Sequence, residues 1–456
     1  MRTLVFFGAT GNLFTRKILP ALVSLFLAGE EFRVIAVGRR LEDAPSYHSF
    51  VITLLGSSFP HNALLSFLKR VSYVRGDIFE KDLTGRLSSL LSPKDYLHFY
   101  LSTLPSLYRP VLHLVTQLCQ KMAPENLYVA LEKPFGQSGR DFLLLEEDLK
   151  RLFPEDHIFY VDHYLGKATV QNLIVLKAEN LFIERLLSRE FVEEVHAAVF
   201  EEEGVGERGA FYEETGAIKD IFQNHLLQLL SLLAVDIPPL CEEDQRECTA
   251  FLSEMAKRKA ALLSRIRLPK GEDVQLGQYE GYRRETGNPY SWKETFFFLP
   301  LFLETERWRG VPFYLASGKR MAEKRSYLEV IFSSTTPSPN RLIIEIQPEE
   351  RIDLVIHVRT PELVLGSSPV TLNFSYSGTF KANTPQAYEK ILYDFLHGDR
   401  TLFPDSAFIR EAWHITDALL ATLQRNPPRF CRYREGMLTS TTLFTGKKIS
   451  NEICLG

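Results

Sequence analysis

The first third of the chain alternates short apolar runs with segments of helical length, and this pattern restricts the fold more than any other feature of the sequence. The segments of helical length lie at residues 14–28, 107–122 and 140–152. The apolar runs lie at residues 3–7, 33–37, 71–74, 96–101, 127–131 and 157–161. Buried strands that alternate with helices form a parallel sheet with helices on both faces. We therefore expect a doubly wound α/β domain of the Rossmann type over residues 1–163.

The last third of the chain has a different pattern, because its apolar segments are β-rich and closely spaced. These segments lie at residues 296–303, 312–315, 327–332, 341–347, 352–358 and 370–376. Leu342, Ile344 and Ile346 alternate with residues of the opposite face, which is typical of a half-buried strand. Helices are expected at residues 167–185, 220–234, 385–396 and 406–424. Residues 164–456 are therefore predicted to form an α+β domain whose large, mainly antiparallel sheet packs on helices.

Length and charge narrow the possible partners. A chain of 456 residues suits two or three domains. Its 53 basic and 57 acidic side chains give a net charge of −4, which provides no attraction to nucleic acid or to an anionic membrane. No apolar stretch has the length of a membrane span or of a secretory signal. We therefore expect small-molecule partners, with no nucleic acid and no membrane.

The cysteines give no sign of a covalent or metal framework. Their number is odd and no C-x-x-C pair occurs; they are Cys119, Cys241, Cys248, Cys431 and Cys454. Neither a disulfide framework nor a zinc site is expected from this pattern. A reducing compartment, the cytoplasm, is the predicted location.

A glycine-rich turn follows the first predicted strand. The sequence there is Gly8-Ala9-Thr10-Gly11-Asn12-Leu13, and a helix is expected to follow it. Glycines at such a turn let the backbone approach a pyrophosphate, which the start of the helix then stabilises. The spacing is G-x-x-G rather than the full G-x-G-x-x-G, and a tight turn needs glycine with or without a ligand. Its position after the first strand of a βαβ unit favours a bound nucleotide.

Two arginines follow the second predicted strand. Dinucleotide-binding folds that take NAD usually place an acidic residue there, to hold the ribose 2′-hydroxyl. Arg39 and Arg40 occupy this place instead, and a guanidinium suits a 2′-phosphate. The alternative is a solvated basic turn. Together with the glycine turn, these arginines favour NADP as the cofactor.

Polar residues gather after the fifth and sixth predicted strands. Asp162-His163-Tyr164-Leu165-Gly166-Lys167 follows the sixth, and Glu132-Lys133-Pro134 follows the fifth. Ligands of doubly wound sheets bind at the carboxyl ends of the strands, so the first cluster suits a phosphate or a sugar. Lys133 can bridge cofactor and substrate. A surface turn is the alternative for either cluster.

A histidine inside an apolar helical stretch is the candidate base. His225 lies within residues 218–234, where a buried histidine more often serves the core than catalysis. Oxidation of an alcohol requires removal of its proton as hydride leaves, and neutral histidine performs this near pH 7. Asp162 is the candidate partner that fixes the tautomer of His225.

Five blocks of the sequence, in the expected order, resemble the glucose-6-phosphate dehydrogenases. They are GATGNLFTRKILPAL at 8–22, EKPFG at 132–136, DHYLGK at 162–167, KDIFQNHLLQLL at 219–230 and GVPFYLASGK at 310–319. DHYLGK together with QNHLLQ is highly specific, whereas the glycine turn and EKP also occur in other sugar dehydrogenases. The resemblance implies oxidation of C1 of D-glucose 6-phosphate by NADP to the phosphogluconolactone, the first step of the oxidative pentose phosphate pathway. It also implies a homodimer or homotetramer, with the large sheet at the dimer interface.

The resemblance assigns a role to individual residues. His225 would be the general base and Asp162 its partner. The substrate would contact Lys133, His163, Tyr164, Lys167, Glu201, Asp220, Lys319 and Gln347. The cofactor would lie along Gly8, Thr10, Gly11, Asn12, Leu13, Lys17, Arg39, Tyr108 and Lys133.

The chain departs from the family pattern at two places. The family loop usually reads G-D-L-A, where this chain has Gly11-Asn12-Leu13-Phe14. Animal members hold a second, structural NADP with arginines that fall here on Ala316, Glu329 and Glu345, although Arg325 keeps a cation at the place of a lysine. We therefore predict one NADP per subunit. Two alternatives to the family function are another NADP-linked sugar oxidoreductase and a non-catalytic NADP-binding homologue.

Overall fold

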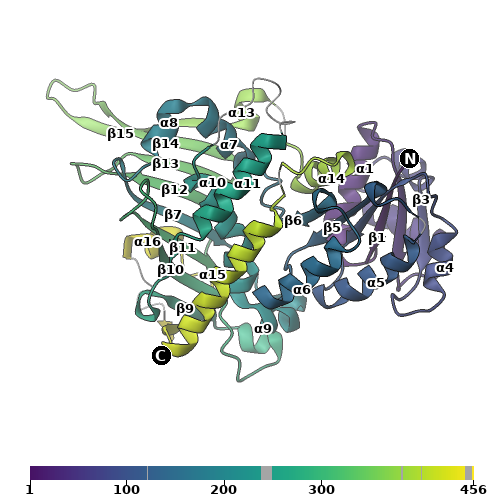
Figure 1. Cartoon of the computed structure of the whole chain (residues 1–456). Coiled ribbons are helices and arrows are strands. Elements are labelled where there is room, and N and C mark those ends of the chain that lie inside the picture. Colours follow the sequence, from purple (N-terminus) through teal and green to yellow (C-terminus); the bar gives the residue numbers. More distant parts are fainter. Residues whose placement is uncertain (121, 238–248, 382–383, 402, 447–453, 456) are drawn as a thin grey trace. The chain divides into compact units, whose positions relative to one another are not determined.

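The computed structural model describes residues 1–120, 122–237, 249–381, 384–401, 403–446 and 454–455 (Figure 1). The chain forms two compact units. The first unit consists of Met1–Gly166 and Pro385–Ser406, and the second of Lys167–Thr384 and Ala407–Gly456. The chain therefore passes from one unit to the other more than once.

The first unit is built on a parallel sheet of six described strands. Their order is β3-β2-β1-β4-β5-β6, and every neighbouring pair is parallel. The strands are β1 (Arg2–Phe7), β2 (Arg33–Gly38), β3 (Val71–Arg75), β4 (Tyr96–Leu101), β5 (Leu127–Glu132) and β6 (Ile158–Val161). This order reverses between β1 and β4, which places the ligand crevice of such sheets at the ends of these strands. The predicted doubly wound α/β domain is confirmed.

Helices connect the strands of the first unit. They are the π-helical segment η1 (Phe14–Ile18), α1 (Leu19–Leu27), α2 (Ala44–Leu55), α3 (His61–Leu68), α4 (Leu83–Ser88), α5 (Tyr108–Leu118) and α6 (Gly139–Lys150). A further helix, α14 (Ala387–His397), comes from far along the chain and packs on α1 and η1. Its buried side chains Ile391, Leu392 and Phe395 belong to the hydrophobic core of the first unit. A single cut at residue 163 would assign α14 to the second domain.

The second unit is built on an 11-stranded sheet within the described residues. Its order is β15-β14-β13-β12-β7-β11-β10-β9-β16-β17, and β8 pairs with β10. The strands are β7 (Val192–Phe200), β8 (Ile266–Arg267), β9 (Gln275–Tyr279), β10 (Phe296–Leu303), β11 (Pro312–Gly318), β12 (Arg325–Phe332), β13 (Arg341–Gln347), β14 (Arg351–Arg359), β15 (Ser367–Ser375), β16 (Arg429–Tyr433) and β17 (Cys454–Leu455). The pairs β7–β11 and β9–β16 are parallel and the other pairs are antiparallel. The predicted mainly antiparallel sheet is confirmed.

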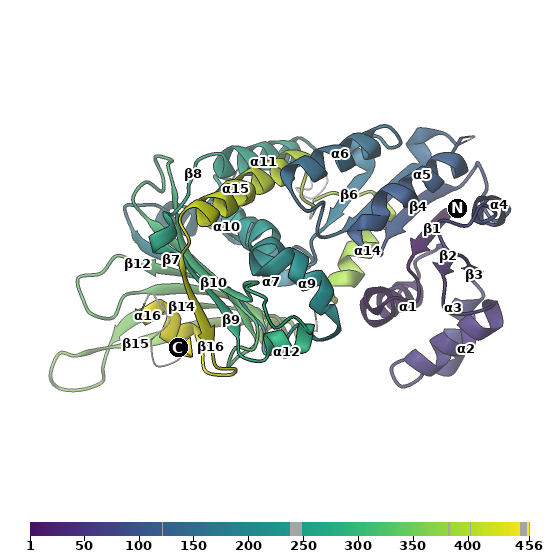
Figure 2. The same cartoon turned by 90° about the horizontal axis from the view of Figure 1, so that it is seen from below.

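Helices cover one face of this large sheet. Figures 1 and 2 show α7, α10, α11 and α15 over that face and α16 on the other. The helices of the second unit are α7 (Ala168–Glu179), α8 (Leu181–Leu186), α9 (Gly209–Ala217), the π-helical segment η6 (Ile218–Leu226), α10 (Leu227–Ala234), α11 (Thr249–Leu263), α12 (Tyr282–Thr286), α13 (Tyr376–Phe380), α15 (Ser406–Arg425) and α16 (Ser440–Gly446). Among the described helices, none combines the length and the apolar character that a bilayer span requires.

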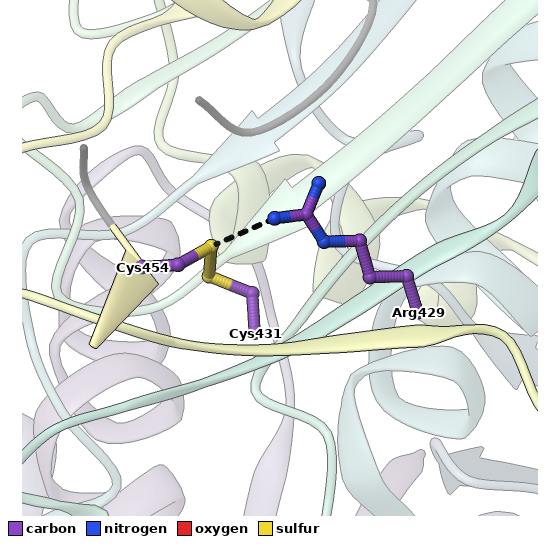
Figure 3. Close-up of a disulfide and its surroundings, with 3 residues drawn as sticks. All are labelled: Arg429, Cys431 and Cys454. Atoms are coloured by element: carbon purple, nitrogen blue, oxygen red, sulfur yellow. Dashed lines mark hydrogen bonds between the residues drawn. A yellow bond between two sulfur atoms is a disulfide. The ribbon is translucent and has the colours of Figure 1, made fainter. Parts of the chain in front are cut away.

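A disulfide joins two strands at the end of the large sheet, between Cys431 of β16 and Cys454 of β17 (Figure 3). The expectation that the chain forms no disulfide is wrong for this pair. The two cysteines are 23 residues apart in the sequence, but pairing of β16 with β17 brings their Cα atoms to 5.4 Å. Cys119 is buried and free, and Cys241 and Cys248 lie outside the described residues.

Candidate active site

The glycine turn after β1 is a tight structure that requires glycine at its first position. Gly8 has φ +91°, a conformation that other residues rarely adopt. A Cβ atom there would lie 2.6 Å from the carbonyl oxygen of Ser102. The N–H groups of Gly8 and Ala9 donate to the carbonyl oxygen of Val37, at 3.1 and 2.9 Å. The turn therefore has the bare backbone that a pyrophosphate needs for close approach.

The helix after this turn shows where the unusual residues of the loop lie. Phe14 is fully buried and its ring packs edge-on against Phe6, with the ring centroids 5.1 Å apart. Phe14 therefore fills the core rather than the turn. Asn12 and Lys17 are exposed. The predicted cofactor residues Thr10, Gly11 and Leu13 are half-buried between β1 and η1.

Two guanidinium groups lie beside the glycine turn. Arg40 donates to the carbonyl oxygen of Thr10 at 3.2 Å. Arg39 is largely exposed and its Nη1 lies 2.9 Å from Asp77 Oδ2. The hydrogen bond from Arg39 lowers the pKa of Asp77. A 2′-phosphate can take the place of this half-buried carboxylate beside the exposed guanidinium of Arg39, so the arrangement fits NADP.

A buried carboxylate supports the end of β5. Glu132 accepts hydrogen bonds from the hydroxyls of Tyr100 and Tyr388, at 2.5 and 3.1 Å. Burial raises the pKa of Glu132 to about 7. Tyr108 is buried and donates to the carbonyl oxygen of Glu132. These bonds fix the backbone that carries the half-buried Lys133, and a role of Tyr108 towards the cofactor stays a prediction.

The residues after β6 form a structured turn. Asp162 is 2% exposed, and its Oδ1 accepts the N–H of Tyr164 at 3.0 Å. His163 is half-buried and stacks with Tyr388, with the ring centroids 6.2 Å apart. A Cβ atom on Gly166 would lie 2.6 Å from the carbonyl oxygen of Ala387. His163 and Gly166 therefore pack against helix α14, a contact that the sequence analysis did not predict.

In the second unit, several strands end at one edge of the large sheet. Ser326 pairs with Val199 on one side and with Gln347 on the other, and Phe200 pairs with Gly318. The carboxyl ends of β7, β11 and β13 therefore share this edge. The predicted substrate residue Gln347 is half-buried there, at the end of β13.

Two predicted substrate residues form an ion pair at this edge. The Lys319 ammonium contacts the Glu201 carboxylate, and Lys319 is only 6% exposed. Lys319 Nζ also lies 5.2 Å from the ring centroid of the buried Tyr212. The Tyr433 hydroxyl donates to the carbonyl oxygen of Lys319 at 2.6 Å. Lys319 is therefore held at a fixed place beside Glu201.

The π-helical segment η6 carries the candidate base. His225 and Asp220 are 1% and 5% exposed, and η6 packs against β7 and β11. The Asn224 side-chain oxygen accepts the N–H of His225 at 2.7 Å. Burial, together with the nearby Asp220 and Glu201, raises the pKa of Tyr212. Such π-helical turns often occur at functional sites.

Glu294, which the sequence analysis did not single out, fixes the start of η6. Its Oε1 accepts the N–H of Ile218 at 3.3 Å, and its carbonyl oxygen accepts the N–H of Ala217 at 3.0 Å. A Cβ atom on Gly216, which has φ +63°, would lie 2.1 Å from that carboxylate oxygen. Gly216 marks the break in the helix at the sequence level, but it does not identify Glu294 as the residue that packs there.

The predicted site residues divide between the two units. The first unit holds the candidate cofactor residues together with Asp162, His163 and Tyr164, and the second holds Glu201, Asp220, His225, Lys319 and Gln347. Lys167, which is half-buried, is the first residue of the second unit and directly precedes α7. The predicted pairing of Asp162 with His225 joins residues of different units and stays a prediction.

Family models match both halves of the chain. The model described as "Glucose-6-phosphate dehydrogenase, NAD binding domain" matches residues 5–172. The model described as "Glucose-6-phosphate dehydrogenase, C-terminal domain" matches residues 174–447.

Curated relatives and solved structures agree with these models. The chain is 31% identical to a glucose-6-phosphate 1-dehydrogenase of Chlamydia muridarum, over 95% of this chain and 93% of the relative. It is 33% identical to the enzyme of the same name from Borreliella burgdorferi, over 90% of this chain and 89% of the relative. A crystal structure of the Mycobacterium avium enzyme has a TM-score of 0.83 at 28% identity and covers 95% and 94%. A glucose-6-phosphate dehydrogenase in complex with its substrate glucose 6-phosphate has a TM-score of 0.85 at 26% identity and covers 99% and 98%.

Proposed function

The chain belongs to the glucose-6-phosphate dehydrogenase family, and from this premise we propose that it oxidises C1 of D-glucose 6-phosphate to 6-phospho-D-glucono-1,5-lactone with NADP. The observation that carries the proposal is the buried His225 on η6, within the QNHLLQ block. A relative of the same fold has been solved with this substrate. The reaction is the first step of the oxidative pentose phosphate pathway.

We propose that the first unit binds NADP and that most substrate contacts come from the second. When bound, NADP supplies the hydride acceptor. The turn at Gly8 and Gly11 would hold its pyrophosphate, and Arg39 its 2′-phosphate. Lys133 would reach both cofactor and substrate from the end of β5. Thr10, Asn12, Leu13, Lys17 and Tyr108 complete the proposed cofactor site.

His225 is the proposed general base. As hydride leaves C1, the neutral imidazole would accept the proton of the C1 hydroxyl. A positive charge then develops on the ring, and the proposed partner Asp162 would stabilise it and fix the tautomer. The turn that carries Asp162 is already structured, because its Oδ1 accepts the N–H of Tyr164.

Cations and hydrogen-bond donors would hold the substrate. His163, Tyr164 and Lys167 lie in one block and are the proposed ligands of the 6-phosphate. Glu201, Asp220, Lys319 and Gln347 would surround the sugar. The ion pair between Lys319 and Glu201 supports this, because it fixes a donor and an acceptor side by side at the sheet edge.

A direct assay tests the proposed reaction. The absorbance of NADPH should rise when the protein is mixed with NADP and glucose 6-phosphate. NAD, galactose 6-phosphate and free glucose serve as comparisons in parallel. A faster reaction with galactose 6-phosphate than with glucose 6-phosphate would favour another sugar oxidoreductase. No reaction with any combination of sugar and cofactor would favour a non-catalytic homologue.

Replacing Arg39 with alanine should weaken NADP binding and leave NAD binding almost unchanged, because only NADP carries the 2′-phosphate. The measurement is the KM for each cofactor at saturating glucose 6-phosphate. Arg70, exposed at the opposite end of β3, gives the control variant Arg70→Ala. Equal losses with NADP and NAD would mean that Arg39 acts on the fold.

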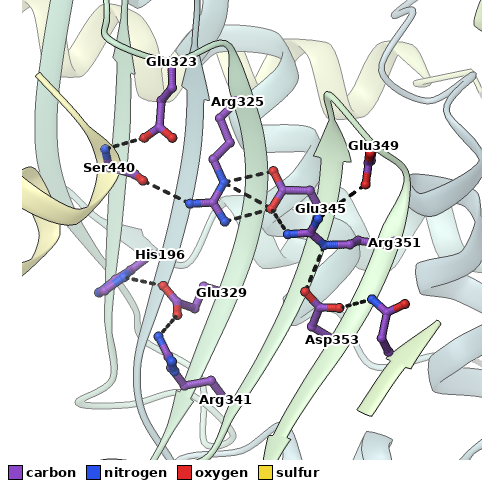
Figure 4. Close-up of polar contacts among 11 residues, drawn as sticks. His196, Glu323, Arg325, Glu329, Arg341, Glu345, Glu349, Arg351, Asp353 and Ser440 are labelled. Atoms are coloured by element: carbon purple, nitrogen blue, oxygen red, sulfur yellow. Dashed lines mark hydrogen bonds and ion pairs between the residues drawn. The ribbon is translucent and has the colours of Figure 1, made fainter. Parts of the chain in front are cut away.

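Calorimetric titration should find one NADP per subunit. The positions that resemblance assigns to a second, structural NADP carry Glu329 and Glu345, each of which lies in its own group of ion pairs (Figure 4). Arg325 Nη2 lies 2.8 Å from a Glu345 oxygen, and His196 and Arg341 contact Glu329. These carboxylates repel phosphates and already engage the neighbouring cations. A second binding event that Arg39→Ala leaves unchanged would contradict this prediction.

Assembly and location are also proposed from the resemblance. We propose a homodimer or homotetramer, and sedimentation of the purified protein distinguishes these states from a monomer. A cytoplasmic location is proposed as well, and the Cys431–Cys454 disulfide makes it directly testable. Free-thiol labelling of protein from rapidly quenched cells would show whether this bond exists there.

A further inference from the structure

A pocket of about 750 Å³ lies in the second unit, where β9 leads into α12 and where β16 ends. It is separate from the residues proposed to bind the substrate. Its lining contains three guanidinium groups, two carboxylates and one thioether, from Arg284, Arg432, Arg434, Glu280, Glu435 and Met437. The pocket is therefore rich in arginine.

The arginines of this pocket have unused hydrogen-bonding capacity. Within the described part of the chain, no hydrogen bond or ion pair holds the side chain of Arg284, Arg432 or Arg434. Arg432 Nε is shielded from solvent and still has no acceptor among the described residues. That atom is out of reach of a ligand, but Arg284 and Arg434 are exposed and Arg432 is half-buried, so the terminal guanidinium nitrogens are the donors that a ligand can contact.

The carboxylates do not neutralise these arginines. Glu435 Oε1 accepts the N–H of Gly281 at 3.0 Å, and its Oε2 lies 3.5 Å from Arg320 Nε. Both oxygens of Glu435 therefore have partners other than the three arginines, and Oε1 also lies near Arg284 Nη2 beside Gly281. Glu280 is exposed and contributes one further negative charge. The pocket keeps a positive excess that favours an anion.

We propose that this pocket binds an organic phosphate. The planar guanidinium fork matches the oxygens of a phosphate group, and several arginines together suit a doubly charged anion. Met437 is 53% exposed and gives the organic part of the ligand an apolar contact. The volume is within the range of small-molecule pockets and suits an organic phosphate smaller than NADP, which is expected in the first unit alone.

Residues 432–437, which form one wall of the pocket, are hydrogen-bonded to the segment that contains Lys319. Tyr433, next to Arg432, donates its hydroxyl to the carbonyl oxygen of Lys319 at 2.6 Å. The N–H of Gly436 donates to the carbonyl oxygen of Arg320 at 2.8 Å. A ligand that reorders this wall therefore changes the position of Lys319. This link to glucose 6-phosphate binding rests on the proposed function.

Protection from an arginine-specific reagent tests the site without using activity. The full-length protein is treated with phenylglyoxal in the presence of pyrophosphate or ATP, and mass spectrometry gives the modification rate of each arginine. We expect the rates of Arg432 and Arg434 to fall by about tenfold, since phosphate contacts shield the guanidinium groups. Arg309, exposed in the same unit, should react at an unchanged rate.

The outcomes distinguish the parts of the proposal. If the modification rates of Arg432 and Arg434 are halved at a lower concentration of ATP than of pyrophosphate, the ligand is an organic phosphate. If pyrophosphate halves these rates at the lower concentration, the proposal of an organic phosphate is overturned. Equal slowing of Arg309 would show ionic screening, and no protection would exclude the site. In Arg432→Gln, the protection of Arg434 should be lost, whereas Arg309→Gln should retain it.

Kinetics test the link to Lys319. The change that pyrophosphate causes in the KM for glucose 6-phosphate should be larger in the wild type than in Arg434→Gln, whereas Arg309→Gln should behave as the wild type. Equal changes in wild type and Arg434→Gln would overturn the link. If no NADPH forms at all, the proposed function fails, while the protection experiment still reports on the pocket.

Discussion

Replacing His225 with asparagine is expected to lower kcat by about 10²–10⁴-fold, the usual contribution of a general base. Asparagine is smaller but keeps a polar group near the position of Nδ1, and it cannot accept the proton of the C1 hydroxyl. The KM values should change little, because folding and binding do not depend on proton transfer. Steady-state kinetics with NADP and glucose 6-phosphate give kcat and both KM values.

The control for this variant is His414→Asn, since His414 is exposed on α15 in the same unit. It should behave as the wild type. Near-normal turnover of His225→Asn would exclude His225 as the base, whereas loss of thermal stability would assign it to the core.

Asp162→Asn should also lower kcat, but by less than His225→Asn does. The base stays in place in this variant and loses only the control of its tautomer.

Replacing Lys167 with alanine should raise the KM for glucose 6-phosphate by roughly ten- to a hundred-fold. A hydrogen bond to a charged group contributes ~1.5–3 kcal/mol, and the ammonium group is the proposed contact to the 6-phosphate. The kcat should change much less, because C1 lies at the other end of the sugar. The KM for glucose 6-phosphate, measured at saturating NADP, gives the effect.

Free glucose provides the decisive comparison for Lys167. Because free glucose has no phosphate, the rate at which it is oxidised should be almost unaffected by Lys167→Ala. An equal loss with both sugars would mean that Lys167 positions α7 instead, since this residue directly precedes that helix. Lys270→Ala, which removes an exposed lysine of the same unit, is the matched control.

The sequence predicted the parallel sheet of the first unit because its strands are buried on both faces. Such strands are continuous apolar runs, as in β1, where five of six residues are buried. The central strand β7 was not predicted. Its residues Glu193 and Glu194 interrupt the apolar pattern, and its partners β11 and β12 lie more than a hundred residues further along the chain. Long-range pairing of this kind leaves no local signal.

The same distinction applies to the candidate site. Motifs in the sequence located the candidate residues that follow the strands, because backbone geometry and ligand chemistry restrict the residue types at those positions. They did not predict the contact partners, such as Asp77 for Arg39 or Glu201 for Lys319. Those partners come from other strands or turns, so only the folded sheet brings them together. Glu294 is the clearest case, since its carboxylate supports η6 from a distant segment.

Helix α14 has a consequence for how the protein is made. The core of the first unit includes Ile391, Leu392 and Phe395, so this core is incomplete when residue 166 leaves the ribosome. All of Lys167–Thr384 must be synthesised before α14 emerges. At about 5–20 residues per second, this is a delay of roughly 10–40 s. During that interval the nascent first unit exposes the apolar surface that α14 later covers.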